Sequence, residues 1–201
     1  MESVKFSVAL IFVFSIICCK KPMNNPGLSL QNFPLAIGDK WVYQVIDSSG
    51  ASPSIDTETI IVTFKNTYPN DSVVYFTQTT LNNIAVDSGT IIASNNFLSY
   101  RYTNFYYSLF NDLEILFPLA LNETWLGNNF KVSGANISIN TLGNTYTNVY
   151  QINENASGFY GPVFDVVDIC PNVGIVYQSL SYTMTYGTKR TSARLINYSL
   201  H

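Results

Sequence analysis

The sequence predicts an all-β protein built as one antiparallel domain. Apolar and polar residues alternate with a period of two, β-branched and aromatic residues fill the alternating runs, and short Gly, Asn, Pro and Ser clusters separate them. Strands whose two faces differ in polarity are typical of an antiparallel sheet with one buried face. We therefore expect a strongly curved sheet, roll or barrel-like fold, with a two-sheet β-sandwich as the alternative.

The first half of the chain gives the clearest strands. Residues 41–46, 59–64 and 73–76 alternate, and Ile60, Val62 and Phe64 are expected to share one face. A hairpin should follow, in which residues 90–94 and 97–102 are joined at Asn95-Asn96, because Asn tolerates positive φ. Residues 103–116 fit neither period well, so we treat them as a connection.

The second half continues the same pattern. Residues 130–140 alternate with a shift near Gly134 that indicates a β-bulge. Further strands are expected at residues 145–153, 159–169, 174–186 and 191–200, which brings the domain to about ten strands.

One motif occurs twice, as FPLAIGDKW at residues 33–41 and FPLALNETW at residues 117–125. Rigid proline backbone and apolar bulk predict a structural plug at an open end of the sheet, and a binding site used twice is the alternative. The repeat also predicts two halves, residues 33–116 and 117–201, which an old duplication would explain. The shared residues are Phe33, Pro34, Leu35 and Trp41 in the first copy and Phe117, Pro118, Leu119 and Trp125 in the second.

The N-terminus reads as a targeting segment. An apolar run from Phe6 to Ile17 is shorter than the roughly 20 residues that span a bilayer, but it suits a signal peptide. Cys18 and Cys19 end the run and resemble a bacterial lipobox, so residues 1–18 are expected to be removed and Cys19 to be lipidated. Residues 19–32 would then form a flexible tether. An ordinary signal peptide or an uncleaved anchor is the alternative.

Lipidation determines the expected location and one partner. Palmitate-type acyl chains on Cys19 would hold the domain on a membrane, as a lipoprotein of the outer membrane or cell surface that faces the periplasm or the exterior. From residue 33 onward, seven basic side chains face twelve acidic ones, so nucleic-acid binding is not expected.

The sequence lacks the residues that several common catalytic mechanisms require. Besides the two N-terminal cysteines the chain has only Cys170, and its one histidine is the terminal His201, where chains usually fray. Triad catalysis, metal centres and cofactors are therefore not expected, and neither is an enzyme. Pairs of acidic residues offer one remaining route to catalysis, because two carboxyl groups can hydrolyse a glycan. Acidic residues on turns or on the solvent face of a strand are commoner, however. These pairs are Asp56 with Glu58, Asp112 with Glu114, and Asp165 with Asp168.

An aromatic run is the main candidate for a ligand surface. Flat rings stack on sugar faces and tyrosine adds a hydroxyl group, although aromatic residues are also ordinary components of strands and cores. The candidate ligand residues are Tyr100, Tyr102, Tyr106 and Tyr107.

Three fragments together carry a resemblance to a known group. FPLAIGDKWVY at residues 33–43, GNTYTNVYQI at 143–152 and PNVGIVYQSLS at 171–181 occur in this order, before a last strand at 194–200. The pattern resembles a group of uncharacterised secreted lipoproteins of Bacteroidota-type bacteria. The resemblance implies a fold and a location but no activity.

The sequence as a whole favours a lipid-anchored binding or assembly module without enzymatic activity. Its partner would be a protein, a glycan or a lipid. A carrier that holds a hydrophobic ligand inside the curved sheet is the first alternative, and a carboxylate-based glycan hydrolase is the second.

Overall fold

The computed structural model describes residues 27–102, 110, 113–158, 161–185 and 187–201. These residues form one antiparallel sheet and a short 3-10 helix, η1 (Leu30–Asn32). The first six strands are β1 (Lys40–Asp47), β2 (Ser54–Thr67), β3 (Val73–Leu81), β4 (Ile84–Ser94), β5 (Phe97–Tyr102) and β6 (Glu114–Leu116). The last six are β7 (Thr124–Trp125), β8 (Phe130–Thr141), β9 (Asn144–Gly158), β10 (Gly161–Cys170), β11 (Gly174–Met184) and β12 (Gly187–Ser199).

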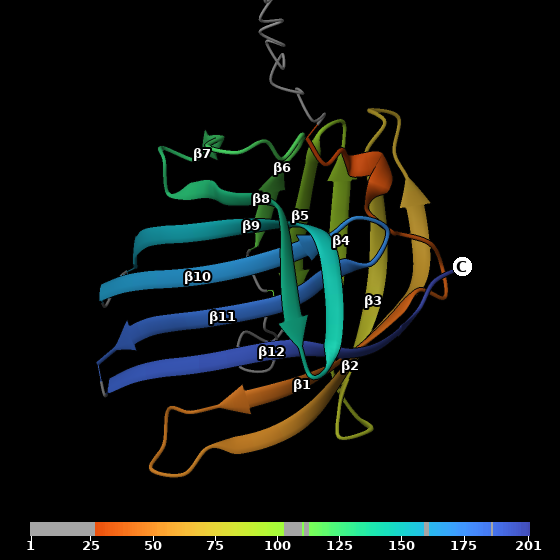
Figure 1. Ribbon diagram of the computed structural model, residues 1–201. Coiled ribbons are helices and arrows are strands. Elements are labelled where there is room, and N and C mark those ends of the chain that lie inside the picture. Colours follow the sequence, from red (N-terminus) through yellow and green to blue (C-terminus); the bar gives the residue numbers. More distant parts are fainter. Residues whose placement is uncertain (1–26, 103–109, 111–112, 159–160, 186) are drawn as a thin grey trace, which may run out of the picture.

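The twelve strands follow the order β6-β5-β4-β3-β2-β1-β12-β11-β10-β9-β8-β7. Two six-stranded meanders thus meet where β1 pairs with β12. In Figure 1 the strands β9–β12 run across the direction of β3–β5, so the sheet curves around its own core and nearly closes. The predicted curved, barrel-like all-β fold is confirmed. The structure has twelve strands where about ten were expected. The two extra strands are β6 and β7, which have only three and two residues and are too short to show alternation in the sequence.

Asparagine pairs form two of the hairpin turns. Asn95 has φ 51° where β4 turns into β5, as predicted. A second pair, Asn82 (φ 50°) and Asn83 (φ 66°), joins β3 to β4 and was not predicted. Because of this turn, β3 and β4 are longer than the runs at residues 73–76 and 90–94 suggested.

The two FPLA segments, residues 33–41 and 117–125, form the same turn. A residue with positive φ, Gly38 (96°) or Asn122 (70°), donates its N–H to a valine carbonyl of the neighbouring strand at 2.9 Å. The next residue, Asp39 or Glu123, accepts an N–H from that same valine at 2.9 Å. Asn can replace Gly here because it is one of the few side chains that adopt this φ region readily.

Both segments contribute to the core and contact each other. The rings of Phe33 and Phe117 meet edge to face with centroids 6.3 Å apart. Trp41 and Trp125 are 5% and 8% exposed, so neither forms part of a shared surface groove. Trp41 donates its indole N–H to the Val173 carbonyl at 2.7 Å. Trp125 donates to the Glu114 carbonyl at 3.2 Å and so links β7 to β6 across the gap in the sheet.

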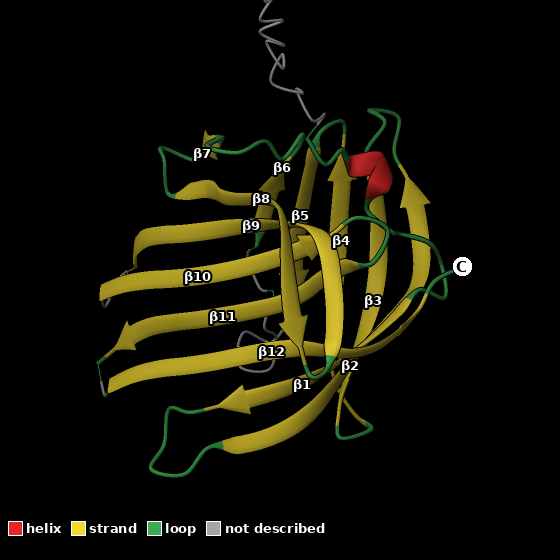
Figure 2. Ribbon diagram, in the orientation of Figure 1, coloured by secondary structure: helices red, strands yellow, loops and turns green. Residues whose placement is uncertain are grey.

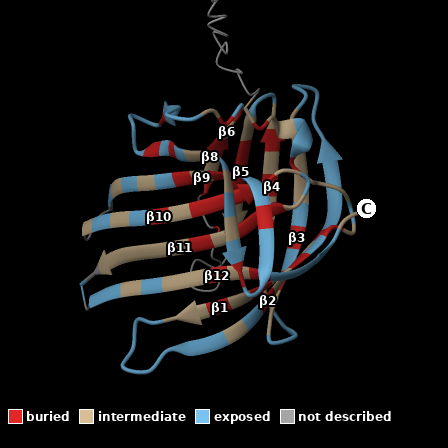
Figure 3. Cartoon of the chain, in the orientation of Figure 1, coloured by how far each residue is buried: buried red, intermediate tan, exposed pale blue. Residues whose placement is uncertain are grey.

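The tip of the β8–β9 hairpin leaves the sheet and forms an arm, residues 137–149. Strand β9 pairs with β10 only as far as Tyr150, and beyond that point β8 and β9 pair only with each other. Figure 2 shows this hairpin lying across β10, β11 and β12. All four residues from Val167 to Cys170 are buried, as expected for a strand end covered on both faces, and Figure 3 shows the same burial pattern.

His201 is bound, contrary to the expected frayed end. Its backbone N–H donates to Asp39 Oδ1 at 2.8 Å, and its ring packs on Gly38. In the part of the chain that the structure describes, no helix is long and apolar enough to cross a membrane.

Candidate functional site

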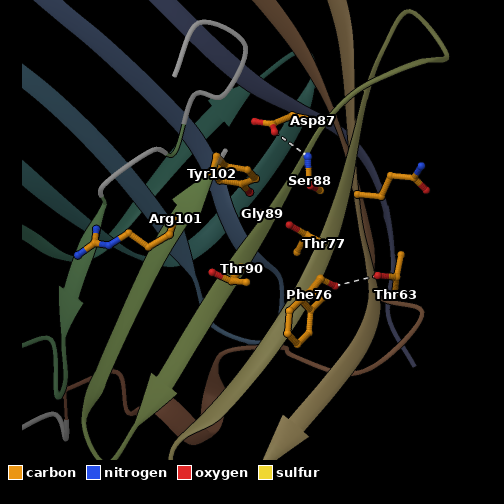
Figure 4. Close-up of a pocket in the computed structure, with 10 residues that line it drawn as sticks. Thr63, Phe76, Thr77, Asp87, Ser88, Gly89, Thr90, Arg101 and Tyr102 are labelled. Atoms are coloured by element: carbon orange, nitrogen blue, oxygen red, sulfur yellow. Dashed lines mark hydrogen bonds between the residues drawn. The ribbon is translucent and has the colours of Figure 1, made fainter. Parts of the chain in front are cut away.

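A solvent-open hollow of about 630 Å³ lies on β2–β5, and we call it the outer hollow (Figure 4). Hydroxyl and amide side chains from three of these strands line it, together with the aromatic rings of Phe76 and Tyr102 and the charged residues Asp87 and Arg101. The hydroxyl and amide groups belong to Thr63, Thr77, Gln78, Ser88 and Thr90. Its volume falls in the range of roughly 300–1,000 Å³ that is usual for ligand pockets.

Two exposed phenylalanine rings lie at the outer hollow. Phe76 lines it, and Phe64 lies beside Phe76 with ring centroids 5.7 Å apart. They are 37% and 57% exposed, although rings of this size usually lie mostly buried. An exposed aromatic pair beside hydrogen-bonding groups offers both an apolar contact and directional recognition.

Phe64 corrects a prediction from the sequence. It was expected on the same face as Ile60 and Val62, which are buried. The pairing of β2 with β3 shifts between Val62 and Phe64, so that Thr63 becomes the extra residue of a bulge. A bulge changes which face the following residues occupy. Because no Gly or Pro marks this bulge, the exposure of Phe64 could not be predicted from the sequence.

Arg101 and Glu114 form an ion pair at one side of the outer hollow, and the Arg101 side chain remains 41% exposed. Opposite charges that are already paired gain little from a further counterion in water. Uncharged hydroxyl and amide groups therefore provide most of the recognition chemistry in this hollow.

The predicted tyrosines do not assemble as one surface. Tyr100 is 5% exposed, lies with its ring centroid 5.8 Å from that of Phe110, and has a pKa well above its usual range because of burial. Tyr102 is half-buried and lines the outer hollow, with its ring packed against Gly89. Tyr106 and Tyr107 lie outside the described residues.

Two of the buried carboxyl groups, Glu58 and Asp165, lie one in each half of the sheet and have strongly raised pKa values. Burial raises the pKa of Glu58 to about 8, and the nearby charge of Asp87 adds to the effect. Burial also raises the pKa of Asp165 to about 8, although a 2.5 Å hydrogen bond from Gln178 Nε2 opposes it. Both groups are therefore protonated over most of the neutral range.

Of the three predicted carboxylate pairs, Asp56 and Glu58 are two residues apart on β2 and lie on one face of that strand. Asp165 and Asp168 are three residues apart on β10 and point to opposite faces; the cross-strand partner of Asp165 is instead Glu154. Glu114 pairs with Arg101, and Asp112 is outside the described part of the chain. Among the residues that the structure describes, no group of three His, Cys, Asp or Glu side chains could hold a metal ion.

Of the cysteines, only Cys19 was predicted as a site, for lipidation. Cys19 lies in the N-terminal stretch that the structure does not describe. Cys170 is buried as a free thiol and contacts the Thr147 carbonyl of the arm at 3.6 Å. It behaves as a small apolar residue that helps to hold the arm on the sheet.

Comparisons with known proteins show a shared fold. No protein-family model matches this chain, and no curated protein sequence matches it significantly. A crystal structure from Bacteroides fragilis NCTC 9343, described as an exported protein with a YmcC-like fold, aligns with a TM-score of 0.52. That pair is 12% identical and the alignment covers 86% of this chain and 99% of the other.

A second crystal structure, described as a lipoprotein from Parabacteroides distasonis ATCC 8503, aligns with a TM-score of 0.44 and 15% identity. The alignment covers 84% of this chain and 98% of the other. At 12% identity, the likeness to the Bacteroides fragilis structure shows a shared fold, described there as YmcC-like, and nothing more.

Proposed function

We propose that this protein is a lipid-anchored extracytoplasmic module that binds a glycan, without cleaving it, through the outer hollow. The exposed Phe64–Phe76 pair beside uncharged hydroxyl and amide groups carries the proposal. Carbohydrates present apolar ring faces together with many hydroxyl groups, so they match both halves of this surface.

The anchor part of the proposal rests on the N-terminal sequence. Cys19 follows an apolar run and precedes a Pro- and Gly-containing tether, which would let the domain stand away from a membrane. Replacing Cys19 with Ala should move the protein from the membrane fraction to the soluble fraction. A Cys19→Ala variant that still sediments with membranes would contradict lipidation at this residue.

The packing of the domain favours surface binding over a carrier function. Apolar side chains from both halves, such as Leu98, Val132, Ile169 and Leu195, are completely buried and form one continuous cluster. The outer hollow is open to solvent and has polar groups in its lining. A hydrophobic ligand would instead need an enclosed apolar cavity.

Glycan binding can be tested with two aromatic substitutions and a matched control. The purified domain is presented with a panel of neutral oligosaccharides, and Phe64→Ser and Phe76→Ser are each expected to weaken binding about tenfold through loss of ring contact. Phe164→Ser is the control, because Phe164 is 48% exposed on β10, away from the outer hollow. Equal loss in all three variants, or binding by none of the glycans, would contradict the proposal.

The same assay separates binding from hydrolysis. The oligosaccharides should be recovered intact after incubation at a range of pH values. If new reducing ends appear and Glu58→Gln or Asp165→Asn removes them, the carboxylate-based hydrolase is correct and the non-enzymatic proposal is wrong.

A further inference from the structure

A second hollow, of about 350 Å³, lies between the arm and the face of the sheet beneath it, and we call it the arm hollow. Residues 139–142 at the tip of the arm form one wall. The opposite wall consists of Asp168 from β10, Tyr177 from β11 and Arg194 from β12. Four strands, β8, β10, β11 and β12, therefore contribute to one small polar space.

Strand register places the three wall residues in one row. Asp168 pairs with Tyr177, and Tyr177 pairs with Arg194, so the carboxylate and the guanidinium lie on either side of the phenol ring. Because adjacent strands are roughly 4.8 Å apart, the Cα atoms of Asp168 and Arg194 are separated by about 10 Å. Their side chains can both reach a ligand that lies over Tyr177.

Neither charge in the row is neutralised by an opposite charge of the protein. Asp168 is 4% exposed, and its one side-chain hydrogen bond comes from the uncharged Gln151 amide at 3.0 Å. Arg194 has no ion pair or side-chain hydrogen bond to any described residue, and it is half-buried. Buried charges are normally paired or strongly hydrogen-bonded, because removing them from water is costly.

The opposite wall holds a third unmatched group. Thr141 is 7% exposed, and its Oγ1 atom is buried without a hydrogen-bond partner in the described structure. Native proteins satisfy most such buried atoms, so an orphaned hydroxyl on a residue that lines the arm hollow is consistent with a polar ligand that completes its hydrogen bond.

We propose that the arm hollow binds a small zwitterion of the amino-acid or dipeptide class. Its ammonium group would bind Asp168, its carboxylate would bind Arg194, and its body would lie on the Tyr177 ring. Opposite charges on two sides of one hollow favour a ligand that itself carries both charges over a neutral sugar or a simple anion. This site is separate from the outer hollow, so it does not depend on glycan binding.

The test uses L-alanyl-L-alanine as the probe and heteronuclear NMR titration of the whole domain as the readout. Saturable shifts are expected in amides of residues 139–142 and in those next to Asp168, Tyr177 and Arg194. N-acetylation of the probe removes its positive charge and C-amidation removes its negative charge. Each modification should weaken binding at least tenfold, a result that does not depend on any variant folding.

Variants then assign each charge to its partner. Asp168→Asn should weaken binding of the dipeptide at least tenfold but make little difference to the N-acetylated form, and Arg194→Gln should do the same for the C-amidated form. Asp71→Asn and Arg190→Gln are matched controls, since both residues are exposed and lie outside the arm hollow. No saturable binding at millimolar dipeptide, or equal binding of the blocked and free dipeptides, would overturn the proposal.

Discussion

The two FPLA segments make the same turn in different surroundings. The first precedes β1, which is held between β2 and β12 in the middle of the sheet. The second precedes β7, a two-residue strand at the end of the strand order that pairs only with β8. The same local sequence can therefore produce the same backbone turn in both places, while the position in the sheet decides how much stability depends on it.

Side-chain contacts show the difference most clearly. Asp39 is 1% exposed and accepts hydrogen bonds from the backbone N–H groups of Ala36, at 2.7 Å, and His201, at 2.8 Å. Its counterpart Glu123 is exposed, and its side chain makes no hydrogen bond within the described residues. The first turn thus ties the end of the chain to the centre of the sheet, and the second does not.

The largest expected effect comes from the two tryptophans. Trp41→Ala should cost about 3–5 kcal/mol in the free energy of unfolding, because it removes a buried ring and the hydrogen bond to Val173 at the centre of the sheet. Trp125→Ala should cost at least about 1 kcal/mol less, since its ring stacks on Phe130 at a sheet end that can relax. Urea unfolding measures both values. Equal losses would show that position in the sheet does not matter.

The buried carboxyl groups compare the two halves directly, through the pH dependence of stability. Glu58 and Asp165 have native pKa values of about 8, above their ordinary values of 4.5 and 3.8. Between these limits the native state holds a proton that the unfolded state has lost, so stability falls as the pH rises. The slope approaches about 1.4 kcal/mol per pH unit for each group, and the loss is complete above about pH 8.

Glu58→Gln and Asp165→Asn should each flatten this slope by a similar amount and stabilise the protein at pH 8. Unfolding free energies measured from pH 5 to pH 8 test the expectation. A variant that leaves the slope unchanged would mean that its carboxyl group is not protonated in the native state.

The smallest expected loss of stability concerns Asp39 and Glu123, the equivalent residues of the two FPLA turns. Asp39→Ala should cost about 1–3 kcal/mol, because it leaves two backbone N–H groups without their acceptor. Glu123→Ala should stay within about 0.5 kcal/mol, as is usual for an exposed residue without side-chain contacts. Thermal unfolding of the two variants side by side would reveal the difference, and similar melting temperatures would argue against it.

The sequence by itself determined the fold class and most strand positions. Alternating β-branched and aromatic residues predict strands because side chains on a strand point to opposite faces in turn. The Asn95-Asn96 hairpin could be predicted for a similarly local reason, the tolerance of Asn for positive φ. The apolar residues of the FPLA repeat likewise indicated packing before any contact was known.

Only the tertiary structure decided where the candidate sites lie. A bulge at Thr63 exposes Phe64, and it depends on how β2 and β3 pair. Tyr177 and Arg194 are neighbours through strand register, and the arm hollow forms because β8 and β9 bend across them. Alternation is a property of one strand, whereas register, bulges and bends depend on two or more strands and on the core that they share.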